Sequence, residues 1–169
     1  MFLIDDSACV RENVWADIRQ SLATFVSFAT VYDKDGVDLA FVHTGNQYRG
    51  ITSCQDFMEK FGNEKVVGDG SSLSYSLDCH LAAYKKKYQD QLQQEKSQKP
   101  LNLIVLTSGD PGEIDDFEET VIKYAIEFEK LGAPIKQLGI QFVLLHSRPE
   151  NQERFQKLDD ISLWKPHIR

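Results

Sequence analysis

Three runs of almost uninterrupted apolar residues limit what this chain can fold into. They cover residues 1–4 (MFLI), 101–106 (LNLIVL) and 138–145 (LGIQFVLL), and a fourth strand-like run covers residues 37–42 (VDLAFV). Such runs are typical of parallel strands buried on both faces of a sheet, because helices cover both faces. We therefore expect four strands in one mostly parallel sheet, near residues 1–5, 37–43, 101–107 and 138–145.

Helical patterns separate these runs. Strands that alternate with helices predict a doubly wound α/β sheet with helices on both faces. The helix that begins near Ser72 is expected to end within the polar stretch 89–99. Gly132 followed by Pro134 is a stop signal for the helix that begins near Ile114. Three sets of apolar residues recur at spacings of three and four, and each set predicts a helix with one apolar face. The sets are Val14, Ile18, Leu22, Phe25 and Ala29; Leu73, Leu77, Leu81, Tyr84 and Tyr88; and Ile114, Phe117, Val121, Ala125 and Phe128.

The size and charge of the chain restrict its class of function. The sequence has 169 residues, which suits a single domain over residues 1–169. Its formal net charge is −7. Because an acidic surface repels phosphate backbones, we expect no nucleic-acid partner. No apolar run approaches the ~20 residues of a membrane-spanning helix, so we expect no membrane insertion.

The cysteines and the first residues bear on the compartment. Cys9, Cys54 and Cys79 form an odd set without a Cys-x-x-Cys spacing, which favours a reducing environment over a disulfide framework. The apolar run 1–4 is too short for a signal peptide, and two acidic residues follow it. We therefore expect a cytoplasmic protein.

The topology predicts where a site would lie. In open α/β sheets, ligand sites form at the carboxyl ends of the parallel strands. The loops to consider therefore follow Ile4, Leu106 and Leu145. The first loop begins with the residues Asp5-Asp6-Ser7-Ala8-Cys9, and the second begins with Thr107-Ser108-Gly109.

Motifs in and near these loops resemble those of a von Willebrand factor type A (vWA) domain. Residues 5–9 (DDSAC) resemble the family's D-x-S-x-S signature, residues 67–73 (VGDGSSL) its glycine-rich turn, and residues 104–109 (IVLTSG) its strand ending in T-D-G. Residues 136–143 resemble the last central strand of vWA-like proteins of fungi and bacteria. The resemblance covers nearly the whole chain and depends on the order and spacing of short motifs; the alternative is a generic Rossmann-like sheet.

The resemblance implies a metal-ion-dependent adhesion site, and it assigns the metal to Asp5, Ser7 and Ser71. In the family, hydroxyl and carboxylate oxygens hold Mg²⁺, whose open position accepts a carboxylate from a partner. Two positions depart from this pattern. Cys9 replaces a Ser ligand with a soft thiol, and Ser108 replaces the carboxylate of T-D-G. The site therefore resembles a degraded form of the family's site.

The losses predict weak metal binding at most. We expect no tightly bound cofactor, with weak Mg²⁺ binding as the alternative. Whether Asp6, Asp69 or Asp110 replaces the missing carboxylate stays open. Purely structural roles are open too: Asp5 and Asp6 can satisfy their own loop and the helix that follows, Ser71 can be an N-cap, and Cys9 can be a small buried hydrophobe.

The resemblance implies a non-catalytic module that binds another protein through the carboxyl-edge loops. One alternative is a weak Mg²⁺- or Mn²⁺-dependent binder. Another is a small hydrolase with Cys9 or Ser7 as nucleophile and His43 or His146 as base. The chain has no G-x-S-x-G elbow and no phosphate-binding P-loop, so we expect no enzyme. The expected ligand-binding residues are Asp5, Asp6, Ser7, Cys9, Ser71 and Ser108.

Overall fold

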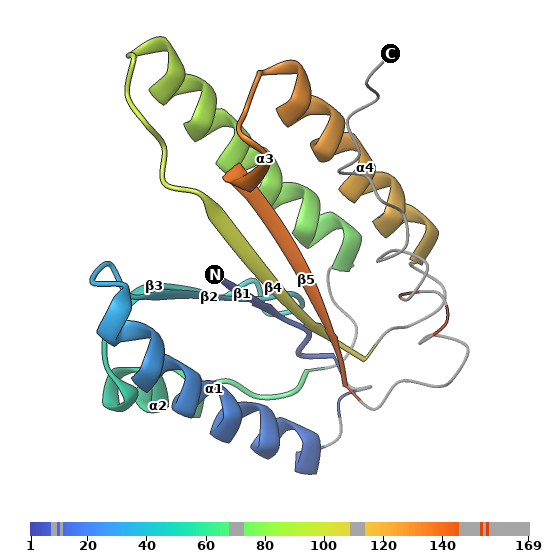
Figure 1. Ribbon diagram of the computed structural model, residues 1–169. Coiled ribbons are helices and arrows are strands. Elements are labelled where there is room, and N and C mark those ends of the chain that lie inside the picture. Colours follow the sequence, from blue (N-terminus) through green and yellow to red (C-terminus); the bar gives the residue numbers. More distant parts are fainter. Residues whose placement is uncertain are drawn as a thin grey trace.

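A five-stranded sheet forms the centre of the computed structural model, which describes residues 1–7, 10, 12–67, 73–108, 114–145, 153 and 155 (Figure 1). β1 pairs in parallel with β2 and β4, and β4 pairs in parallel with β5, whereas β3 is antiparallel to β2. The four predicted strands therefore lie in one mostly parallel sheet, and that prediction is confirmed. In chain order the strands are β1 (Phe2–Ile4), β2 (Val37–Phe41), β3 (Gln47–Ile51), β4 (Leu101–Thr107) and β5 (Leu138–Leu144). Their spatial order across the sheet is β3-β2-β1-β4-β5.

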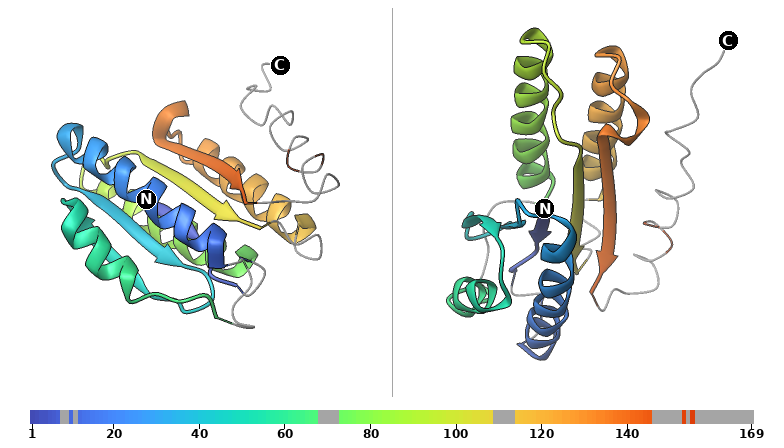
Figure 2. Two further views of the ribbon diagram at one scale, coloured as in Figure 1. Left: turned by 90° about the horizontal axis from the view of Figure 1, so that it is seen from below. Right: turned by 60° about the vertical axis from the view of Figure 1, so that its left-hand side comes forward.

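Alternate residues of the central strands enter two separate cores, one on each face of the sheet. Phe2 and Ile4 belong to the core under α1 and α2, whereas Leu3 between them belongs to the core under α3 and α4. Figure 2 shows the two helix pairs on opposite faces. A strand covered on both faces must be apolar on both sides, which explains the continuous runs. The helices are α1 (Glu12–Tyr32), α2 (Cys54–Gly62), α3 (Leu73–Gln93), α4 (Ile114–Lys130) and a short 3-10 turn at Ile135–Gln137.

Two elements, β3 and α2, have weak sequence signals and were not predicted. β3 has one buried residue, Ile51, because an antiparallel edge strand needs no continuous apolar run. α2 is short and buries only Phe57 and Phe61. Its clearest signal is an N-cap, in which the Ser53 side chain accepts a hydrogen bond from the backbone N–H of Asp56.

The helices α3 and α4 end within the predicted segments. α3 ends at Gln93, inside the polar stretch 89–99. After α4, Gly132 adopts a φ of 66°, and its N–H donates to the carbonyl oxygen of Glu129 at 2.9 Å. The N–H of Ala133 then donates to the carbonyl oxygen of Phe128 at 3.0 Å. These bonds satisfy the last turn of the helix and direct the chain back towards β5.

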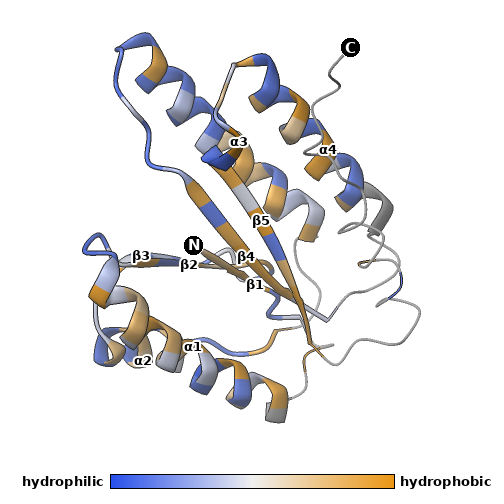
Figure 3. Cartoon of the chain, viewed as in Figure 1, coloured by the Kyte–Doolittle hydropathy of each residue, from blue (hydrophilic) through white to orange (hydrophobic). Residues whose placement is uncertain are grey.

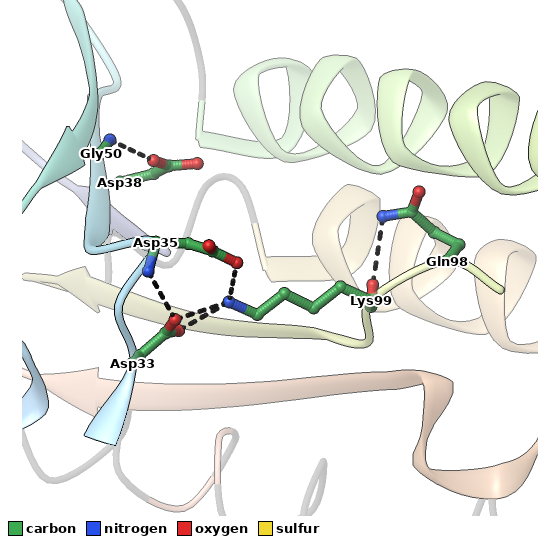
Figure 4. A network of polar contacts seen from close by, with 6 residues as sticks. All are labelled: Asp33, Asp35, Asp38, Gly50, Gln98 and Lys99. Carbon is green, nitrogen blue, oxygen red and sulfur yellow. Dashed lines mark hydrogen bonds and ion pairs between the residues drawn. The ribbon is translucent and has the colours of Figure 1, made fainter.

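A lysine joins two turns at the amino edge of the parallel strands (Figure 4). The ammonium of Lys99, just before β4, lies 2.7 and 2.8 Å from the carboxylate oxygens of Asp33 and 2.9 Å from a carboxylate oxygen of Asp35. Both aspartates lie in the turn between α1 and β2. The contact therefore holds the start of β4 next to the start of β2.

The helices show the polarity of surface helices with one apolar side. Figure 3 shows hydrophobic and hydrophilic residues alternating along α3 and α4, as expected where one helix face packs on a sheet and the other meets solvent. Among the described residues, no helix is long and apolar enough to cross a membrane.

Candidate functional site

The segments that follow three parallel strands start side by side at the carboxyl edge of the sheet. The backbone N–H of Asp5 donates to the carbonyl oxygen of Leu106 at 2.8 Å, and the N–H of Leu145 donates to the carbonyl oxygen of Thr107 at 2.8 Å. These bonds continue the pairing of β1 with β4 and of β4 with β5 beyond the ends of β1 and β5. Asp5, Thr107 and Leu145 are thereby fixed relative to one another.

Asp5 is the centre of a hydrogen-bonded cluster at this edge. Its Oδ2 accepts hydrogen bonds from the Thr107 hydroxyl, the Ser108 backbone N–H and the Ser108 hydroxyl, each at 3.1 Å. Its Oδ1 accepts the N–H of Ser7 at 3.0 Å and lies 3.4 Å from Nε2 of His43. A carboxylate has about four lone-pair sites, so these contacts account for its accepting capacity. Asp5 itself is only 5% exposed.

The hydrogen bonds keep Asp5 ionised although it is buried. Burial by itself raises the pKa of a carboxyl group, but hydrogen bonds from Ser7 and Ser108 favour the charged form and lower the pKa of Asp5 below its ordinary value. Asp5 is therefore a buried anion stabilised mainly by neutral donors. The second ring nitrogen of His43, Nδ1, is buried and has no hydrogen-bond partner among the described residues.

Asp6 is fully buried and orders the neighbouring backbone. Its carboxylate oxygens accept the backbone N–H groups of His43 at 2.7 Å and Thr44 at 3.0 Å. Its carbonyl oxygen accepts the N–H of Val67 at 2.8 Å, and Ser7 forms an isolated parallel bridge with Val67. Asp6 thus connects β1 with the β2–β3 turn and with the segment that follows α2.

Glu64 is a third buried acidic residue at this edge, and no sequence pattern pointed to it. Both of its carboxylate oxygens accept hydrogen bonds from the Asn46 amide at 3.1 Å, and one also accepts the Tyr48 hydroxyl. The hydrogen bond to Glu64, with burial and the charge of Glu64, raises the pKa of Tyr48 to about 12. Through these hydrogen bonds, Glu64 holds the β2–β3 hairpin against the segment that follows α2.

Part of the predicted site is brought together. Asp5, Ser7 and Ser108 are in contact, as the topology predicted, and Asp6 is next to them in the same loop. Their roles in ligand binding stay predictions. The remaining predicted or considered residues, Cys9, Ser71, Asp69, Asp110 and His146, lie outside the described residues.

Three hydroxyl-bearing side chains in the described part of this edge reach solvent. Ser7, Thr44 and Ser108 are partly exposed, whereas the three carboxylates beside them are at most 7% exposed. In the described part of the chain, neither ring nitrogen of His43 hydrogen-bonds to the Ser7 hydroxyl, the contact that a serine nucleophile and its base require. The arrangement is suited to hydrogen bonding with a partner.

A hard divalent cation fits these residues poorly. Mg²⁺ requires near-octahedral oxygen ligands, but the lone pairs of Asp5 are used by protein donors and both oxygens of Asp6 accept backbone N–H groups. Within the described ranges, no group of three or more His, Cys, Asp or Glu side chains is placed to hold a metal ion. Binding Mg²⁺ here would require Ser108 to turn its hydroxyl proton away from Asp5.

Comparison with known proteins gives one match. Residues 1–162 match the family model described as von Willebrand factor type A domain. Neither the curated proteins nor the solved structures contain a significant match to the chain.

Proposed function

Because the chain belongs to the von Willebrand factor type A family, we propose that it is a non-catalytic module that binds another protein through the loops at the carboxyl edge of its sheet. Domains of this family are typically adhesion or interaction modules. In this chain the binding needs no tightly held metal ion. The partner contacts Ser7, Thr44 and Ser108 directly.

The hydrogen bonding of Asp5 is the observation that supports metal-independent binding. Contacts from Ser7, His43, Thr107 and Ser108 surround its carboxylate, and only His43 among these residues can carry a positive charge. In a metal-dependent site the same carboxylate would face the cation. Here protein donors take that place, so the described residues around Asp5 are held together without an ion.

The way in which the β2–β3 hairpin is held supports a binding role. Asp6 and Glu64 fix the β2–β3 hairpin from two directions, through backbone N–H groups and through the side chains of Asn46 and Tyr48. A surface that is ordered before binding loses less conformational entropy when the partner arrives. The hydroxyls of Ser7 and Ser108 then act as preplaced hydrogen-bonding groups.

Site-specific photo-crosslinking tests this proposal. A photoreactive benzoylphenylalanine replaces Thr44 at the carboxyl edge or, as the control, Lys86, which is exposed in the middle of α3. Irradiation in the native cell should give a discrete crosslinked product from position 44 and none from position 86. A chelator added to a lysate before irradiation should leave the position-44 product unchanged.

The purified crosslinked partner then allows a direct binding measurement. Thr44→Arg should weaken its binding to the isolated chain, whereas Lys86→Ala should not. Equal crosslinking from both positions would contradict binding at the carboxyl edge. Loss of the product on chelation would instead support the weak Mg²⁺- or Mn²⁺-dependent binder.

A further inference from the structure

The second half of α1 presents an uncharged apolar surface to solvent. Residues 20–32 read QSLATFVSFATVY and contain no charged residue, although 27% of the whole chain is charged. Four large apolar side chains in this stretch are exposed: Phe25 by 43%, Phe28 by 64%, Val31 by 60% and Tyr32 by 76%. Phe25 was expected on the buried helix face and is instead partly exposed. In Figure 3 this half of α1 is drawn mainly in orange and pale tones.

Aromatic contacts hold these side chains in place before any partner arrives. The Phe25 ring packs edge-on against the buried Phe2 ring, with centroids 5.1 Å apart. The rings of Phe28 and Tyr32 lie one turn apart on the helix, with centroids also 5.1 Å apart. Rings that are already ordered lose little side-chain entropy on binding. The surface is therefore prepared for association.

We propose that the α1 stripe, defined as Phe25, Phe28, Val31 and Tyr32, binds the α1 stripe of a second copy of this chain in a twofold symmetric dimer. Phe28 lies three residues after Phe25 and four before Tyr32, so the stripe is nearly symmetric about Phe28. If two α1 helices cross antiparallel with the twofold axis beside Phe28, Phe25 of each copy faces Tyr32 of the other. Such self-complementary contacts define an interface with twofold symmetry.

The absence of charge in the α1 stripe permits a second copy as the occupant. Each copy has a formal net charge of −7, so two copies repel where their acidic surfaces meet. The α1 stripe avoids this repulsion because its stretch carries no charge, and the adjoining Asp33 is paired with Lys99. A strongly charged partner would gain no ion pair from residues 20–32. An equally uncharged aromatic surface is the better match, and the stripe itself is such a surface.

The size of the α1 stripe predicts a reversible dimer. An aromatic side chain can bury roughly 200 Å², so the exposed fractions of the three rings and Val31 supply roughly 400 Å² per copy. A standard interface buries about 800 Å² per partner. Neighbouring polar residues such as Ser21 and Thr24 must supply the rest. We therefore expect self-association that depends on protein concentration.

Sedimentation velocity over a wide concentration range tests the proposal. The wild-type chain should shift from monomer to dimer as its concentration rises. Phe28→Lys and Tyr32→Lys should each weaken dimerisation roughly tenfold or more. The first places like charges beside the twofold axis, and the second places a charge against Phe25 of the other copy. Circular dichroism should show unchanged folding, because both side chains are mostly exposed.

The matched control is Tyr75→Lys in α3, where the ring is 64% exposed, as Phe28 is. This variant should dimerise as the wild type does. An equimolar mixture of Phe28→Lys and Phe28→Glu should recover dimer, because opposite charges then meet at the axis. A wild-type chain that stays monomeric at the highest concentration would overturn the second copy as occupant. Equal weakening by Tyr75→Lys would overturn the location.

Discussion

Ser108 donates two hydrogen bonds to a single oxygen of Asp5, one from its backbone N–H and one from its hydroxyl, each at 3.1 Å. The two residues are 103 positions apart in the sequence. An aspartate at position 108 would set a second carboxylate against the first, and a cation would be needed between them. The serine removes that need, because a neutral hydroxyl stabilises Asp5 directly.

Asp5 should stabilise the fold in a pH-dependent way. Asp5→Ala removes the acceptor of the hydrogen bonds from Thr107, Ser108 and Ser7 and should lower the free energy of unfolding by about 3 kcal/mol at neutral pH. Because the folded pKa of Asp5 lies below its ordinary value of 3.8, its ionic stabilisation is present above that value and is lost as the pH falls through the folded pKa.

Asp5→Asn is the matched variant for this pH dependence. Urea titrations between about pH 5 and pH 2 should show a shallower loss of stability in Asp5→Asn than in the wild type, because Asn does not titrate. Identical slopes in the two proteins would show that Asp5 is not preferentially ionised in the folded state.

Restoring the family's ligands should create metal binding. Calorimetric titration of the wild type with Mg²⁺ or Mn²⁺ should show no tight binding, whereas the double variant Cys9→Ser, Ser108→Asp should bind both ions. The metal-free double variant should be less stable than the wild type, because two carboxylates repel. Ser108→Asn with Cys9→Ser is the uncharged control. Tight binding by the wild type, abolished by Asp5→Ala, would contradict this prediction.

Gly36 should be the least replaceable glycine of the described turns. It has a φ of 80°, and an added Cβ would lie 2.6 Å from the carbonyl oxygen of Ile51. Gly36→Ala should therefore cost about 3 kcal/mol of stability or more. Gly45 has a φ of 70° but nothing within 4 Å of an added Cβ. Gly45→Ala should cost only about 1 kcal/mol in the same urea titration, and equal losses would argue against the clash at Gly36.

The ion pairs of Lys99 should protect the loop before β4. Limited proteolysis with subtilisin should cut the wild type within residues 89–99 before other internal sites, and Lys99→Met should be cut several times faster because the loop opens more often. The change in global stability should stay below about 1 kcal/mol, since all three side chains are largely exposed. Lys99→Arg is the control that keeps the charge. Unchanged cleavage in Lys99→Met would show that the ion pairs do not hold the loop.

Three of the strands that the sequence predicted, β1, β2 and β4, are largely buried, and their apolar runs follow from that position. The fourth, β5, is an edge strand in which only Leu138 is buried. Its apolar run still predicted it, because Ile140, Phe142 and Leu144 pack against the core on one face. β3 is also an edge strand with one buried residue, but it has no apolar run and was missed. An element with neither an apolar run nor much burial is found only through local signals such as the Ser53 N-cap of α2.

The site was predicted by topology and missed in its details. The rule that sites form at the carboxyl ends of parallel strands brought Asp5 and Ser108 together correctly. The partners of Asp6 and the role of Glu64 could not be predicted, because both depend on how the β2–β3 hairpin folds over the edge. The spacing of residues in the sequence does not show from which backbone N–H group a buried carboxylate accepts a hydrogen bond.

The position of β1 in the middle of the sheet has a consequence for how the protein folds. β1 is the first strand in the chain, but one of its two neighbours, β4, begins about a hundred residues later. During synthesis, the pairing of β1 cannot be completed until β4 has left the ribosome. Contacts over such distances slow the search for the native state. Until these contacts form, the apolar side chains of β1 would be exposed to solvent. The next helix in the chain, α1, can cover one face of the strand during this time.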